Sequence, residues 1–242
     1  MTTLLLAHAW PLDASMWDEQ VAALKGEVEV LAPSFPGFGG TPPAGETVTM
    51  EAMANSLVAE LDRAGAARAV VCGLSIGGYV TFALWRLHRE RIAGLVLADT
   101  RAEADDQAGK DRRRTVAETV KARGSEWMAE NPPPLLSDGT DPALWGRVKE
   151  IIRRQPAHAI AAAALGMAER TDSRPILSEI DVPTAVIVGS ADALTTPEMS
   201  QTIADGIPRA ELTVLEGAGH LSNLEEPEGF AEAIRKLLRR VS

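Results

Sequence analysis

The sequence predicts an α/β fold, in which a mostly parallel β-sheet is flanked by helices and a helical lid is inserted into the sheet domain. Two observations support this. Short apolar runs alternate with helix-like segments over residues 1–100 and again over residues 174–242, as in proteins whose parallel strands are joined by helices. Residues 101–173 show no convincing strand pattern and are charged and helix-prone. We therefore expect a core of residues 1–100 and 174–242, and a lid of residues 101–173.

The first part of the core shows four strand patterns. Residues 3–9 form a continuous apolar run, which is typical of a strand buried on both faces. The helix expected at 50–65 places Met50, Met53 and Leu57 on one face and ends at Gly65. Strands are expected at 3–9, 28–35, 69–74 and 93–100, and helices at 14–25, 50–65 and 77–92.

The rest of the chain resumes this alternation after the lid. Within the lid, Ile160, Ala164 and Met167 share a helical face, so at least one amphipathic helix is expected there. The final helix carries acidic residues at its start and basic residues at its end, which suits the helix dipole. Strands are expected at 183–190 and 210–217, and helices at 196–207 and 227–241.

Composition and charge exclude several classes of function. The 242 residues carry a net charge of −10, which disfavours binding to nucleic acid or to anionic membranes. The basic clusters at 111–114 and 151–154 are interpreted as solvated helix faces. No apolar run approaches the roughly 18 residues of a membrane helix. One cysteine and no signal-peptide pattern favour a cytoplasmic protein, which we expect to be a monomer or a homodimer.

A serine flanked by glycines follows the third predicted strand. Residues 73–77 are Gly-Leu-Ser-Ile-Gly and match the G-x-S-x-G pattern between a strand and a helix. A nucleophile on such a sharp turn adopts strained backbone angles, and its neighbours approach so closely that a Cβ atom would clash. We expect Ser75 to be a nucleophile. The alternative is a glycine-rich turn without chemistry.

A serine hydroxyl needs a base and an orienting acid to react. Of the four histidines, His220 lies in a loop directly after the last predicted strand and is the best candidate for the base. The acid is expected at a strand end between the serine and the histidine in chain order. Asp192 meets this condition, and Asp99, one strand earlier, is its rival. We favour Asp192, because its loop faces the histidine loop across consecutive strands.

A developing oxyanion needs two hydrogen-bond donors. The backbone N–H of Ile76 lies at a helix start, where it suits this role. The loop after the first strand supplies the second candidate, the backbone N–H of Trp10. We expect His8 to support this loop rather than to act as a base, and the alternative for Trp10 is a packing role.

Five sequence blocks together resemble the α/β-hydrolase fold superfamily, and most closely its small cofactor-free carboxylesterases, enol-lactonases and haloperoxidase-like members. The blocks are HAWPLDASMW (8–17), PSFPGFGGT (33–41), GLSIGG (73–78), GSADALTTP (189–197) and GAGHLSNLEEPEGF (217–230). The resemblance implies a parallel sheet and a helical lid at 101–173. The chain departs from it at Ala9, where the family usually has glycine. Because the first predicted strand directly precedes the block at 8–17, we expect the family's first two strands to be absent.

These residues predict a serine hydrolase that cleaves carboxylic esters of small acyl groups through an acyl-enzyme, without a cofactor. No metal site is expected, because four scattered histidines and one cysteine offer no ligand spacing. Its partner would be a small-molecule ester or lactone. The alternatives are a lactonase, of the 3-oxoadipate enol-lactonase or acyl-homoserine lactone type, a perhydrolase side activity, and a non-catalytic hydrolase-fold ligand receptor.

Several large apolar residues are candidates for the wall of a substrate pocket. Packing of the lid against the core explains the same residues equally well, and arginines in the lid would attract a carboxylated substrate. The candidates are Trp10, Trp127, Met128, Trp145, Leu165, Met167 and Leu221.

Overall fold

The computed structural model describes residues 2–241 and contains one six-stranded sheet of parallel strands in the order β2-β1-β3-β4-β5-β6. The predicted fold class is confirmed. The second strand is shorter than expected, since it ends at Leu31 instead of extending to residue 35. The strands are β1 (Thr3–Ala7), β2 (Glu29–Leu31), β3 (Ala69–Leu74), β4 (Ile92–Ala98), β5 (Thr184–Gly189) and β6 (Ala210–Leu215).

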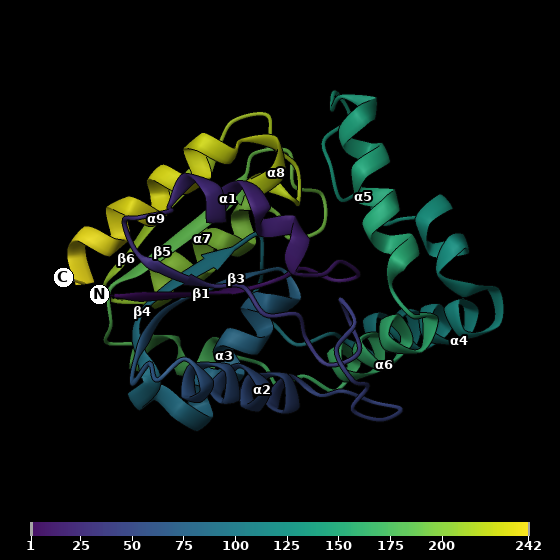
Figure 1. Cartoon of the computed structure of the whole chain (residues 1–242), viewed down its shortest axis with the longest axis horizontal. Coiled ribbons are helices and arrows are strands. Elements are labelled where there is room, and N and C mark those ends of the chain that lie inside the picture. The colour runs from purple at the N-terminus through teal and green to yellow at the C-terminus, as the bar shows by residue number, and fades with distance from the viewer. Residues whose placement is uncertain (1, 242) are drawn as a thin grey trace.

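Helices cover both faces of the sheet (Figure 1). On one face α1 contacts α9, and on the other α2 packs against α3, which lies on β1, β3 and β4. The central strands β1, β3 and β5 are buried along their whole length, because apolar side chains point to both covered faces. These helices are α1 (Asp18–Ala23), α2 (Met50–Arg63), α3 (Ile76–His88), α7 (Pro197–Gly206), α8 (Ser222–Glu225) and α9 (Pro227–Val241).

The lid segment, residues 101–173, contains three helices and no strand among the described residues. These are α4 (Gln107–Glu130), α5 (Pro142–Arg154) and α6 (Ala157–Ala168). Gly124, with φ 82°, interrupts the helical backbone of α4, and glycine adopts this conformation with little strain. The treatment of residues 101–173 as a domain separate from the core stays a prediction.

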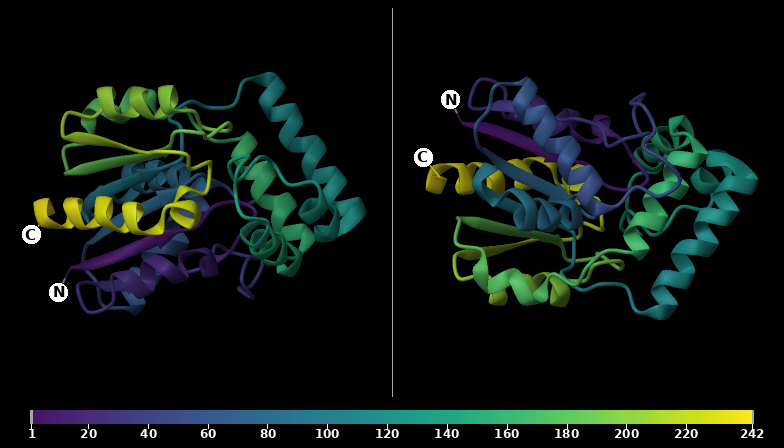
Figure 2. Two further views of the ribbon diagram at one scale, coloured as in Figure 1. Left: turned by 90° about the horizontal axis from the view of Figure 1, so that it is seen from above. Right: turned by 90° about the horizontal axis from the view of Figure 1, so that it is seen from below.

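The lid helices lie together on the side of the molecule that is away from both termini (Figures 1 and 2). Because β1 begins at the N-terminal side and all strands are parallel, the carboxyl ends of the strands face these helices. Ligands of open parallel sheets bind outside the carboxyl ends of the strands. The fold therefore places a site between the strand-end loops and the lid segment.

Candidate active site

Ser75 stands on a sharp turn between β3 and α3, with φ 58° and ψ −116°. Two glycines make this turn possible. A Cβ atom on Gly73 would lie 2.2 Å from the carbonyl oxygen of Gly77, and one on Gly77 would lie 2.2 Å from the carbonyl oxygen of Ala7. No side chain is tolerated at such distances from backbone atoms, so the glycines are required by the close approach of β1, β3 and α3.

Ser75, His220 and Asp192 form a hydrogen-bonded series at the carboxyl ends of the strands. The hydroxyl of Ser75 donates to Nε2 of His220 at 2.8 Å, and Nδ1–H of His220 donates to Oδ2 of Asp192 at 2.9 Å. All three residues are nearly buried, with 9%, 3% and 3% of their surface exposed. Three residues far apart in the sequence are thus brought together in the arrangement that activates a serine.

The loop after β5 keeps the carboxylate of Asp192 ionised and fixed. Its Oδ1 accepts from the backbone N–H groups of Leu194 and Thr195 at 2.8 and 3.0 Å, and its Oδ2 accepts from the Thr195 hydroxyl at 2.7 Å. Burial acts to raise the pKa of Asp192, but the charge of His220 and the hydrogen bonds from His220 and Thr195 outweigh it and lower the pKa. The carboxylate is therefore set to hold Nδ1–H of His220.

The rival acid, Asp99, makes no hydrogen bond to the imidazole of His220. It is fully buried at the end of β4, where it accepts from the backbone N–H of Gly189 at 2.9 Å and from the Ser222 hydroxyl at 2.5 Å. Burial, and then the nearby charge of Asp192, raise its pKa well above the ordinary value. Asp99 thus ties the ends of β4 and β5 to the loop that carries His220.

Two backbone N–H groups near Ser75 make no hydrogen bond to any residue in 2–241, those of Trp10 and Ile76. Ile76 is the first residue of α3, so its N–H has no acceptor within the helix. The indole of Trp10 donates to the carbonyl of Ile160 on α6 at 3.0 Å, which anchors the loop after β1. Both N–H groups predicted as oxyanion donors are therefore free to bind an oxygen.

His8 supports the loop after β1 through hydrogen bonds of both ring nitrogens. The backbone N–H of Phe35 donates to Nε2 of His8 at 2.9 Å, so Nδ1 carries the proton and donates to the carbonyl of Ala9 at 2.9 Å. Burial lowers the pKa of His8 to about 4, and the ring stays neutral at pH 7. With both nitrogens occupied, His8 joins two loops and has no free nitrogen to act as a base.

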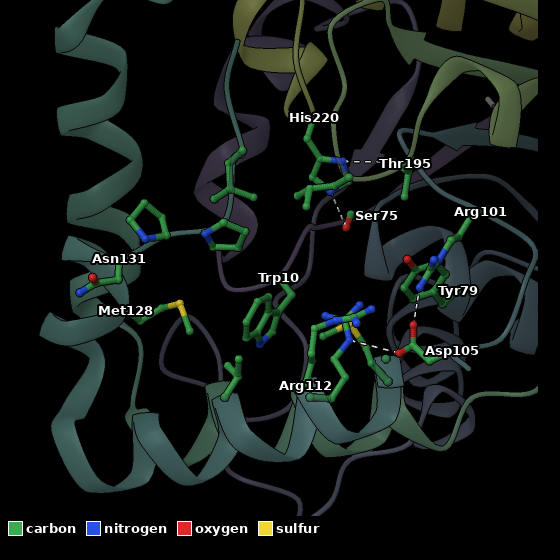
Figure 3. Close-up of a pocket in the computed structure, with 18 of the residues that line it drawn as sticks. Trp10, Ser75, Tyr79, Arg101, Asp105, Arg112, Met128, Asn131, Thr195 and His220 are labelled. Atoms are coloured by element: carbon green, nitrogen blue, oxygen red, sulfur yellow. Dashed lines mark hydrogen bonds and ion pairs between the residues drawn. The ribbon is translucent and has the colours of Figure 1, made fainter. Parts of the chain in front are cut away.

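A cavity of about 400 Å³ opens onto Ser75 and His220 between the strand-end loops and the lid segment (Figure 3). Ligand pockets of small molecules usually have volumes of about 300 to 1,000 Å³. The lining residues are Trp10, Ser75, Tyr79, Arg101, Asp105, Gly109, Arg112, Arg113, Val116, Trp127, Met128, Asn131, Pro132, Pro133, Leu135, Met167, Leu194, Thr195 and His220.

The structure brings four of the predicted pocket residues to this cavity, Trp10, Trp127, Met128 and Met167. The other three do not line this cavity. Trp145 and Leu165 pack, half-buried, against the hydrophobic core, and Leu221 is fully buried in it. An apolar side chain on a lid helix satisfies core packing as readily as a cavity wall.

A family model described as the alpha/beta hydrolase family matches residues 4–233. The chain belongs to the alpha/beta hydrolase family. The resemblance predicted from the five sequence blocks is therefore confirmed, and it extends across the lid segment as well as the core.

Members of this family with esterase and lactonase names are similar over nearly the whole chain. A thermophilic esterase from Thermogutta terrifontis, solved with malate bound, is 41% identical with a TM-score of 0.96, over 100% of this chain and 90% of that one. The enol-lactonase from Burkholderia xenovorans is 26% identical with a TM-score of 0.90, over 98% and 91%. The pimeloyl-acyl-carrier-protein methyl ester esterase of Aromatoleum aromaticum is 30% identical over 98% of both chains.

Within this hydrolase, sequence reasoning missed two residues that a simple spacing rule would have found. Tyr79 lies four positions after Ser75 on α3, so it shares the helix face that meets the cavity. Thr195 lies three positions after Asp192 in a turn, where side chains commonly bond to a preceding carboxylate.

The basic cluster at 111–114, interpreted as a solvated helix face, is exposed at Arg112 and Arg114 and half-buried at Arg113. Arg112 and Arg113 line the cavity, whereas Arg114 pairs with Asp111 at 2.8 Å. No helix in residues 2–241 is long and apolar enough to span a membrane. The same described residues contain no cluster of histidine, cysteine and carboxylate side chains that would hold a metal ion.

Proposed function

We propose that this protein is a carboxylic ester hydrolase in which Ser75 is the nucleophile, His220 the general base and Asp192 the orienting acid. One observation carries the proposal, the series of hydrogen bonds from the Ser75 hydroxyl through the His220 imidazole to the Asp192 carboxylate, at 2.8 and 2.9 Å. The esterase and lactonase names of its relatives support the same class of reaction.

In the first half of the reaction, Oγ of Ser75 attacks the ester carbonyl carbon while its proton passes to Nε2 of His220. The negative charge on the carbonyl oxygen is accepted by the free N–H groups of Trp10 and Ile76. Collapse of the tetrahedral intermediate breaks the bond to the alkoxy oxygen, which takes the proton from His220. The products are a free alcohol and an acyl group bound to Ser75.

In the second half, a water molecule gives its proton to His220 and its oxygen attacks the acyl carbon. The second tetrahedral intermediate then releases the carboxylic acid, and the proton returns to Oγ of Ser75. Throughout, Asp192 holds the imidazole tautomer whose Nε2 is free to accept a proton. These steps use only water and the side-chain and backbone groups of this chain. The cavity volume of about 400 Å³ favours substrates with small acyl groups.

Hydrolysis of p-nitrophenyl acetate tests the proposal. Ser75→Ala is expected to lower kcat by about four to six powers of ten, as loss of the nucleophile does in other serine hydrolases. Ser222→Ala, which removes a buried hydroxyl of the same loop region that does not face the cavity, is the control for general disturbance. Equal hydrolysis by the wild type and Ser75→Ala would falsify the assignment.

A lactonase activity is the second candidate, supported by the enol-lactonase relatives at 26% identity. The same acyl-enzyme chemistry opens a lactone, except that the leaving alcohol stays joined to the acyl group. Measuring kcat/KM on short linear esters and on γ- and δ-lactones of equal carbon number separates the two. A preference for the linear esters of tenfold or more supports the esterase, and the reverse supports the lactonase.

A further inference from the structure

The cavity has one positively charged end. Three arginines of the lid segment line it, Arg101, Arg112 and Arg113, whereas Asp105 is the acidic residue of its wall. In Figure 3, Tyr79, Arg101 and Asp105 lie on one side of Ser75, Met128 lies on the other, and Arg112 lies below Ser75 between Trp10 and Asp105. A substrate held at Ser75 would therefore have a charged wall toward one end and an apolar wall toward the other.

Asp105 does not neutralise this end of the cavity. Its carboxylate is buried and accepts hydrogen bonds from Arg170 at 2.7 and 3.0 Å, from Nε of Arg113 at 3.3 Å, and from Arg101. Burial acts to raise the pKa of Asp105, but the guanidinium groups, Arg170 above all, outweigh it and lower the pKa. One ionised carboxylate thus accepts hydrogen bonds from three guanidinium groups, and the guanidinium of Arg112 adds a fourth positive charge that Asp105 does not bind.

Donors that face the cavity remain unused. Arg112 makes no hydrogen bond or ion pair with any residue in 2–241, and Arg113 uses only its Nε, leaving both terminal nitrogens without a partner there. The hydroxyl of Tyr79 also has no partner in this part of the chain, while the guanidinium of Arg170 covers its ring at 4.3 Å. The geometry offers a set of donors that is suited to an anion.

We propose that Arg112 and Arg113, with the Tyr79 hydroxyl that lines the same cavity, bind a carboxylate of the substrate, so that this hydrolase prefers esters that carry a free carboxylate at their other end. The planar fork of an arginine matches a carboxylate in two parallel hydrogen bonds. The substrate class is the half-esters of short dicarboxylic acids, or lactones with a free carboxylate. This inference rests on the proposed ester hydrolysis and names the substrates of the same site.

A matched pair of esters tests the inference. Monomethyl glutarate carries a carboxylate, and the methyl ester of glutaramic acid has a neutral amide of the same shape in its place. The wild type is expected to show a kcat/KM about tenfold or more higher for the charged ester, since hydrogen bonds to charged groups contribute more than neutral ones. Arg112→Gln and Arg113→Gln are each expected to lower this ratio severalfold, and together to abolish it.

Arg114→Gln is the control variant. Arg114 follows Arg113 directly on α4 and carries the same charge, but it pairs with Asp111 and does not line the cavity. Its charged-to-neutral ratio is expected to equal that of the wild type. Arg112→Lys keeps the charge without the fork and is expected to give an intermediate ratio.

A binding measurement keeps the inference separate from catalysis. Calorimetry with Ser75→Ala and glutarate is expected to show binding that weakens tenfold or more when Arg112→Gln and Arg113→Gln are added. A wild-type ratio near one, or a ratio that these arginine variants leave unchanged, overturns the inference while ester hydrolysis stands. Hydrolysis of neither ester, with glutarate still bound through the arginines, overturns the proposed function and leaves the carboxylate site.

Discussion

The strand-end loops and the lid segment face the same cavity, but they hold their side chains by different means. In the loops, backbone geometry decides the residue: Gly73 and Gly77 have no room for a Cβ atom, and Ser75 has a positive φ. In the lid segment, Arg112, Arg113 and Trp127 line the cavity from α4, where a helical backbone suits many kinds of side chain. The turn that carries Ser75 is therefore built from close backbone contacts, whereas the wall of the cavity is built mainly from side chains that can be replaced.

The largest expected difference in kcat is between substitutions of two buried aspartates in the strand-end loops. Asp192→Asn is expected to lower kcat about ten-thousandfold, because an amide no longer holds the imidazole tautomer that accepts the serine proton. Asp99→Asn, one strand away, is expected to lower it less than tenfold, because Asp99 contacts Gly189 and Ser222 instead of His220. Steady-state hydrolysis of p-nitrophenyl acetate by both variants checks this, and equal losses would return Asp99 to the place of the orienting acid.

Two glycine-to-alanine substitutions, one in each region, compare how far the backbone tolerates a side chain. Gly73→Ala is expected to lower the free energy of unfolding by about 3 kcal/mol, since its Cβ atom would overlap backbone atoms of Gly77. Gly146→Ala, at an open position on α5 of the lid segment, is expected to raise it by about 0.5 to 1 kcal/mol. Urea unfolding measures both. Similar small effects at the two positions would mean that the turn tolerates a side chain.

Within the lid segment, two tryptophans separate the cavity wall from core packing. Trp127→Ala is expected to raise KM for p-nitrophenyl butyrate roughly three- to tenfold, because it removes apolar surface that lines the cavity. Both tryptophans pack, half-buried, on the core, but Trp145 does not line the cavity, so Trp145→Ala is expected to lower stability and to leave KM within twofold. An equal rise of KM in both variants would contradict the observed boundary of the pocket.

The pH dependence of stability gives the smallest effect. Because its folded pKa is raised, Asp99 keeps its proton at pH values where the unfolded chain, with a pKa of about 3.9, has lost it. The native state then binds more protons, so this group lowers stability as pH rises above about 4. Asp99→Asn does not titrate, and its stability relative to the wild type is expected to increase from pH 5 to pH 8. Urea unfolding measures the free energy of unfolding of both proteins. A difference between them that stays constant from pH 5 to pH 8 would contradict the raised pKa of Asp99.

The sheet, its flanking helices and the residues around Ser75 could be predicted because their sequence patterns follow from backbone requirements. Apolar runs mark buried strands, and the glycines around Ser75 mark a turn where little else fits. The chain order of Ser75, Asp192 and His220, in the loops after β3, β5 and β6, predicted residues that the structure brings into hydrogen-bond contact.

The wall of the cavity could be predicted only in part. Apolar residues of a lid helix suit either the core or the cavity, so Trp127 and Trp145 could not be told apart from their sequence. Arg112 and Arg114 lie in one basic run. Only the direction in which α4 presents each side chain decides that Arg112 lines the cavity and Arg114 does not. The positive φ at Gly124 interrupts α4 between Arg113 and Trp127, so the helical period that fits the first part of α4 does not predict which later residues face the cavity.

Labelling with a fluorophosphonate, followed by mass spectrometry of the intact protein and its peptides, tests the central claim most directly. We expect one adduct per chain on Ser75 and no adduct in Ser75→Ala. Labelling of His220→Ala is expected to be much slower, because only a serine activated by its histidine attacks phosphorus. A folded wild-type protein that stays unlabelled, or an adduct on another residue that persists in Ser75→Ala, would contradict it.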